Sequence, residues 1–243
     1  MRNFLAIWQR EWTACFLSPI AYVTMVMFLL LSNWTFWNAV DRRGNESEPL
    51  VLLWCMSICL WLPVLITVIT MRLFAEEKRS GTIETLLTAP VTEWQVVMGK
   101  YAGALSFLIV VVAPALFSIF VLYWMSPGIR DLDGGAVCGG MLILALISLL
   151  CVALGLLISL LTSHQISAAI SCFCGIVLPL LAGYLIRFLP FGSDRLVDYL
   201  LLENHLDDFA RGAVDLRILA LYLSSTLFVL FLCARALEFR KWK

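Results

Sequence analysis

The chain has 243 residues, of which 62% are hydrophobic and only 14% are charged. Charged residues make up about a quarter of an ordinary soluble domain. This composition therefore excludes a soluble domain and indicates a polytopic membrane protein. Basic and acidic residues balance at 17 each, which leaves no charge excess that would attract nucleic acid.

The first 19 residues have the pattern of an amphipathic helix. Phe4, Leu5, Trp8 and Trp12 share one side of such a helix, and polar residues occupy the other side. We expect residues 1–19 to form an interfacial helix in the membrane surface, with a break at Ser18-Pro19. A cytoplasmic extension of the first span is the alternative, and it stays open.

Six apolar windows read as membrane-spanning helices, because each is long enough to cross a hydrocarbon core about 30 Å thick. They are residues 20–37, 50–71, 99–124, 136–161, 166–186 and 218–234. Six spans place both termini on one side. With the termini inside, ten Lys and Arg residues lie on the inner side and seven on the outer side. The expected fold class is therefore an all-α, six-helix membrane bundle with cytoplasmic termini.

The loop after the second window contains a concentrated run of charge. We expect the second helix to leave the membrane through Arg79 and to stop at Gly81 in a left-handed cap. Thr82 is then the N-cap of a short helix over residues 83–88, with Glu84 in its first turn.

The same loop ends with signals for the next helix. Pro90 terminates the short helix, and Thr92 and Gln95 have capping-box spacing for the helix that leads into the third span. The short helix carries three apolar residues, Ile83, Leu86 and Leu87. They either face a soluble partner at the membrane surface or pack under the bundle, and the residues alone leave both readings open.

Two further patterns concern the fifth and sixth windows. Ser167, Ser171 and Gly175 recur every four residues and form a smooth face that favours close helix packing, either within the bundle or between two copies. Residues 187–217 mix aspartates with leucines, which predicts short amphipathic helices at the outer interface.

Sites for chemistry are sparse. The six windows contain no acidic residue and no histidine, which disfavours an ion-coupled carrier. His164 and His205 fall on opposite sides of the membrane, so they cannot share a catalytic or metal site. The Gly99-Lys100 pair lacks the glycine and the hydroxyl residue of a phosphate-binding loop. We therefore expect no catalytic residue, no metal ligand and no ATP bound by this chain itself.

Several segments together resemble a known family. They are residues 74–91 (FAEEKRSGTIETLLTAPV) and 94–101 (WQVVMGKY), with SPIAY at 18–22, His205, FARG at 209–212, DLR at 215–217 and LEFRKW at 237–242. This pattern is similar to permeases of ATP-binding-cassette (ABC) transporters of the exporter-like second class, ABC-2. It looks closest to the permeases associated with gliding motility.

The resemblance implies a single permease domain over residues 1–243 in the bacterial inner membrane. It implies a separate ABC ATPase subunit that binds ATP and Mg²⁺, a second permease copy or a related permease, and an auxiliary membrane protein with an extracytoplasmic domain. The function would be export, or movement of that extracytoplasmic partner; a non-transporting scaffold is the alternative. Residues 72–98 would form the cytoplasmic coupling segment, whose ATPase contacts are Glu76, Glu77, Arg79, Gly81, Thr82, Ile83, Glu84, Leu86 and Leu87.

Overall fold

A computed structural model describes residues 2–43, 49–82, 91–125, 134–187 and 201–241. Every regular element within these ranges is a helix. The elements in chain order are α1 (Arg2–Leu17), α2 (Pro19–Arg43), α3 (Leu50–Thr70), α4 (Ala75–Arg79), α6 (Glu93–Val112), the 3₁₀ turn η1 (Ala113–Ala115), α7 (Leu116–Met125), α8 (Gly134–Leu161), α9 (Gln165–Arg187), α11 (Leu202–Ala210) and α12 (Leu216–Lys241).

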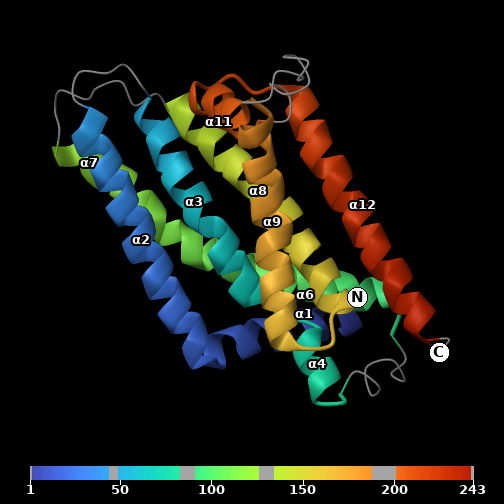
Figure 1. The fold of residues 1–243 in the computed structure, drawn as a ribbon. Coiled ribbons are helices and arrows are strands. Elements are labelled where there is room, and N and C mark those ends of the chain that lie inside the picture. The colour runs from blue at the N-terminus through green and yellow to red at the C-terminus, as the bar shows by residue number, and fades with distance from the viewer. Residues whose placement is uncertain (1, 44–48, 83–90, 126–133, 188–200, 242–243) are drawn as a thin grey trace.

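The long helices form a bundle with two distinct ends (Figure 1). At one end, α1 crosses beneath the bundle close to α4 and the start of α6; this end is called the base below. The last turns of α12 also reach the base. Helix α11 lies at the opposite end. Residues expected on the inner and outer sides of a membrane therefore lie at opposite ends of the molecule.

Five helical stretches are long and apolar enough to cross a membrane. They are Pro19–Arg42, Leu50–Arg79, Glu93–Val121, Gly134–Leu161 and Leu216–Phe239. The remaining expected span falls on α9, whose apolar stretch Gln165–Leu181 is shorter. The multi-pass all-helical fold is confirmed within the described residues, whereas the sixth crossing stays a prediction.

Three local signals in the sequence are confirmed. The break expected at Ser18-Pro19 is present, because α1 ends at Leu17 and α2 begins at Pro19. Gly81 has a φ of +73°, the left-handed conformation that stops a helix. Thr92 and Gln95 form a reciprocal capping box at the start of α6.

The helical stretch expected from the second window to Arg79 is present as Leu50–Arg79, but a turn over residues 71–74 interrupts it. Helix α3 ends at Thr70, and α4 starts only after a turn. The reason is a contact from another part of the chain. The amide groups of Phe74 and Ala75 donate to Ser159 Oγ of α8, at 3.1 and 3.2 Å, so these donors do not need intrahelical acceptors.

Helix α11 is held against the bundle through a close backbone contact. Its buried face consists of His205, Leu206, Phe209 and Ala210. A Cβ at Gly139 of α8 would lie 2.2 Å from the carbonyl oxygen of Phe209, so only glycine fits there. The expectation of an amphipathic helix in residues 187–217 is thus confirmed for 202–210; residues 188–200 lie outside the described part of the chain.

Candidate functional site at the base of the bundle

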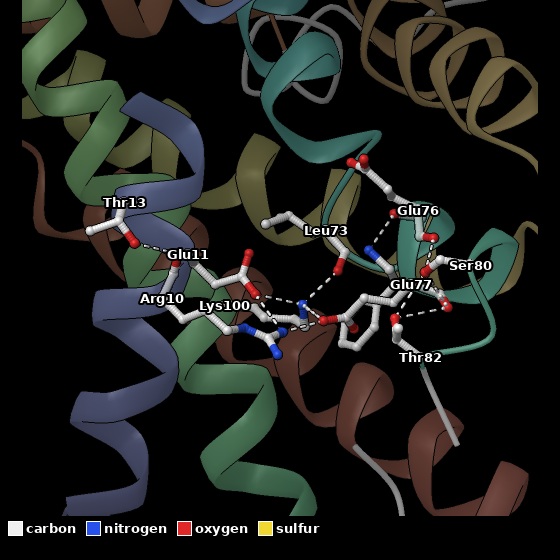
Figure 2. A network of polar contacts seen from close by, with 11 residues as sticks. Arg10, Glu11, Thr13, Leu73, Glu76, Glu77, Ser80, Thr82 and Lys100 are labelled. Carbon is white, nitrogen blue, oxygen red and sulfur yellow. Dashed lines mark hydrogen bonds and ion pairs between the residues drawn. The ribbon is translucent and has the colours of Figure 1, made fainter. Parts of the chain in front are cut away.

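A buried lysine lies at the centre of the base (Figure 2). Lys100 of α6 has a side chain only 1% exposed. Its Nζ lies 2.8 Å from Glu11 Oε1 and 2.9 Å from Glu77 Oε1, and it donates to the carbonyl oxygen of Leu73 at 2.7 Å. A buried ammonium is tolerated only with such partners, because an unpaired charge in the interior costs several kcal/mol.

Arg10 completes the set of charges. Its Nη2 lies 3.2 Å from Glu11 Oε1 and also pairs with Glu77 Oε1. Partial burial lowers the pKa of Arg10, but hydrogen bonds and charge attraction from Glu11 and Glu77 outweigh it and raise the pKa above its ordinary value. Two cations and two carboxylates form a neutral cluster, called the base network below: Arg10, Glu11, Glu77 and Lys100.

The base network joins three separate elements. Arg10 and Glu11 come from α1, Glu77 from α4 and Lys100 from α6. Helices α1 and α6 approach closely enough for this because α6 carries glycine at the crossing. A Cβ at Gly103 would lie 2.7 Å from Glu11 Cβ. The glycine therefore lets Glu11 reach the lysine one turn away.

Helix α4 has a second attachment, to the end of α8. Lys78 Nζ donates to the carbonyl oxygens of Leu160 and Thr162, the latter at 2.6 Å. Carbonyl groups in the last turn of a helix lack intrahelical donors and carry a partial negative charge, which a lysine satisfies. Together with Ser159, Lys78 fixes α4 to α8 on one side while Glu77 fixes it to α1 and α6 on the other.

A cavity of about 450 Å³ adjoins the base network. It lies between the α1–α2 elbow, the end of α3, α4 and α6. Arg72 lies in its wall and donates from Nη1 to Ser18 Oγ at the elbow. The base thus contains both a fixed cluster of charges and an accessible hollow beside it.

The structure separates the predicted ATPase contacts into groups. Glu76, Arg79 and Gly81 are exposed at the base. The Glu77 side chain is only 14% exposed and is engaged in the base network, so its contact with an ATPase stays a prediction. Thr82 is exposed, and its hydroxyl contacts Ser80 Oγ at 2.9 Å. Ile83, Glu84, Leu86 and Leu87 lie outside the described residues, as does the expected short helix 83–88.

The sequence analysis did not single out Arg10, Glu11 or Lys100. One signal was available, since Lys100 is an ionisable residue inside an apolar window, where such residues usually have a specific partner. The partners themselves are far away in sequence: Glu11 is 89 positions from Lys100. No local pattern links the two.

The small-residue face of α9 has mixed surroundings. Ser167 and Ser171 are exposed, whereas Gly175 approaches α8, where a Cβ would lie 2.9 Å from Ile158 Cδ1. The face of α9 that is buried in the bundle carries instead Ala168, Cys172 and Ile176. Packing within the bundle explains the small residue at Gly175 only. Contact of Ser167 and Ser171 with a second copy of the chain stays a prediction.

The described ranges contain no cluster of three or more His, Cys, Asp or Glu residues that could hold a metal ion. A sequence model of the family described as "ABC-2 family transporter protein" matches residues 9–191. The chain belongs to the ABC-2 transporter family. No curated protein gives a significant match to it. The matched region of this ABC-2 protein includes all four members of the base network but ends before α11 and α12.

Membership supports several of the broader expectations. ABC-2 proteins are membrane permeases of ABC transporters, typically non-catalytic, and the family in general implies an ABC ATPase as a partner. The narrower resemblance to permeases associated with gliding motility is not resolved by the family match and stays a prediction.

Proposed function

We propose that this ABC-2 protein is the permease subunit of an ATP-driven complex in the bacterial inner membrane. A separate ATPase subunit binds ATP and Mg²⁺ and docks on the base, which faces the cytoplasm together with both termini. Six spans cross the membrane, and two permease copies pair. The chain itself carries out no catalysis.

One observation carries the proposal: α4 is attached to three helices at once. Glu77 connects it to Lys100 of α6 and, through that lysine, to Glu11 of α1. Lys78 and Ser159 connect the same segment to the end of α8. A partner that moves the segment after Gly81 therefore acts on α1, α6 and α8 together rather than on one loop.

The energetics favour movement as a unit. Separating Lys100 from its carboxylates would leave a buried charge unpaired, at a cost of about 3–5 kcal/mol. Moving packed helices past one another costs less free energy when these ion pairs stay intact. We expect the base network to transmit displacement of α4 to the bundle as a rigid-body shift of helices.

The contacts at the opposite end of α8 suggest how movement could reach an extracytoplasmic partner protein. Helix α8 holds α4 near Ser159 and α11 near Gly139, positions separated by roughly 30 Å along a helix. A tilt of α8 would therefore move α11. This favours, as a second candidate function, a mechanical coupler that moves an extracytoplasmic partner protein without transporting a substrate.

The test begins with affinity purification of the chain from its native host in mild detergent, to identify the ATPase that accompanies it. Two variants then separate docking from transmission. Leu86→Asp with Leu87→Asp should abolish co-purification, because charge enters a contact that excludes water. Glu77→Gln should keep co-purification but lower the ATP hydrolysis rate of the assembled complex several-fold.

Two outcomes would count against the proposal. One is a purified chain with no ATPase bound, together with gradient-driven uptake in vesicles that contain this chain alone. The other is a double variant that assembles and hydrolyses ATP like the parent protein, since residues 82–88 would then not be the coupling element. Exposed Arg235, which forms an ion pair with Glu238 on the same helix α12, supplies the matched control as Arg235→Gln.

A further inference from the structure

Two residues in the wall of the base cavity each carry a buried polar atom that has no partner among the described residues. Arg72 Nε is a donor and Glu77 Oε2 an acceptor, and neither has a hydrogen-bond partner among the described residues. Both residues line the same cavity. Buried polar atoms are nearly always satisfied, so this pair indicates a ligand that accepts at one point and donates at another.

The charges around the cavity have the same dual character. Three cationic and three acidic side chains line it. Four of these six form the neutral base network, which leaves Arg72 and the exposed Glu76 outside it. Arg72 makes no ion pair with any described residue; its recorded partner is the hydroxyl of Ser18. A purely anionic ligand would meet the carboxylates, whereas a zwitterion suits both signs.

The remaining wall is mainly apolar and continues to the surface of the protein. Leu17 and Ile20 at the α1–α2 elbow line the cavity and are also strongly exposed. Val68 and Ile69 of α3 are also part of this apolar wall. A ligand with a polar head and a hydrocarbon chain matches such a hollow better than a soluble metabolite does, because its chain remains among the apolar residues.

We propose that the base cavity binds the head group of a zwitterionic aminophospholipid of the phosphatidylethanolamine type. Its phosphate accepts hydrogen bonds from the Arg72 guanidinium, and its primary ammonium donates to Glu77 Oε2. The acyl chains leave along Leu17 and Ile20. The site depends on the chain lying in a membrane but not on ATPase coupling, so the two proposals can fail separately.

Head-group selectivity of the parent protein gives a test that needs no variant. The full chain, purified in mild detergent, is incubated with equal amounts of phosphatidylethanolamine, phosphatidylglycerol and phosphatidylcholine with identical acyl chains. Retained lipid is measured by native mass spectrometry. Phosphatidylcholine keeps the phosphate but has no N–H donor, and phosphatidylglycerol lacks the ammonium. We expect phosphatidylethanolamine to be retained about tenfold over either, the effect of one charge-assisted hydrogen bond.

Variants locate the site. Arg72→Gln should remove the preference, whereas Arg235→Gln, which lies at the exposed end of α12 outside the cavity, should preserve it. Equal retention of all three lipids, or preference for phosphatidylglycerol, would overturn the proposal. So would competition by soluble phosphoethanolamine as strong as that by the lipid, because the ligand would then be a free phosphate compound.

Discussion

Lys100 Nζ on α6 and Glu77 Oε1 on α4 lie 2.9 Å apart at the base of the bundle, although the two residues belong to different helices. The lysine is almost wholly buried, so its charge depends on Glu77 and Glu11. The ion pair ties α4 to α6 more firmly than apolar contacts alone, because separating it would leave an unpaired charge in the interior.

The first prediction tests how much the buried ion pairs of Lys100 contribute to the stability of the fold. Lys100→Met should lower the free energy of unfolding by about 3–5 kcal/mol, because both carboxylates lose a buried partner and retain only Arg10. Thermal denaturation of the purified chain would measure the loss. Arg235→Met removes an exposed ion pair on α12 and should cost less than about 1 kcal/mol. Equal losses of thermal stability in the two variants would show that the buried ion pairs of Lys100 stabilise the fold no more than an exposed ion pair does.

A second prediction concerns the attachment of α11. Gly139→Ala places a Cβ 2.2 Å from the carbonyl oxygen of Phe209, so α11 must shift or detach. We expect faster proteolysis around residues 201–213 and a lower melting temperature. Gly134→Ala is the matched control, since the added Cβ meets nothing within 4 Å at the start of the same helix. Indistinguishable proteolysis of the two variants would contradict the close contact.

The third prediction follows from the pKa of a cysteine on α1. Burial, followed by the negative charge of Glu11, raises the pKa of Cys15 to about 11. Because the thiolate reacts, alkylation of Cys15 should accelerate roughly tenfold per pH unit from pH 8 to 10 and level off only near pH 11. Glu11→Gln removes one cause, lowers the pKa and should speed the reaction at pH 8.5. Peptide mapping by mass spectrometry gives the rates, and a plateau below pH 9 would refute the shift.

A fourth prediction concerns orientation. Ser80 directly follows α4 and Asp208 belongs to α11, and both residues are exposed. Helices α4 and α11 lie at opposite ends of the bundle (Figure 1). A membrane-impermeant maleimide should modify Asp208→Cys in intact cells, whereas Ser80→Cys should react only after permeabilisation. The reverse pattern would invert the proposed topology.

The features that sequence reasoning located are local ones. Hydrophobic length predicts the long helices. The break at Ser18-Pro19, the stop at Gly81 and the start at Thr92 depend on residues a few positions apart. The interruption between α3 and α4 was not predictable in this way, because it depends on Ser159, 85 residues after Phe74. Long-range partners of this kind follow from how helices pack, and a single sequence does not state which helix faces which.

The contrast between local signals and long-range partners also explains how much of the candidate site could be predicted. Glu77 was singled out from the charge run, but its role as a buried partner required Lys100 and Glu11 to be brought together by the α1–α6 crossing. Glycine at 103 was visible in the sequence, yet only the structure shows that its missing side chain makes room for Glu11. The residue types were therefore readable, whereas their pairing was not.

The last prediction addresses the surface of α9. Ser167 and Ser171 are exposed, and the native Cys174 is exposed on the same helix, while Ala168 faces the bundle interior. If two permease copies meet along this surface, mild oxidation in native membranes should cross-link Ser167→Cys and Ser171→Cys in a Cys174→Ser background. Ala168→Cys should give no dimer, because a neighbouring copy cannot reach its 1% exposed side chain. Denaturing gels without reductant provide the readout. Absence of cross-linking at both serine positions, with normal expression, would assign the dimer interface to another helix, because small residues on a lipid-facing surface need not contact a second copy.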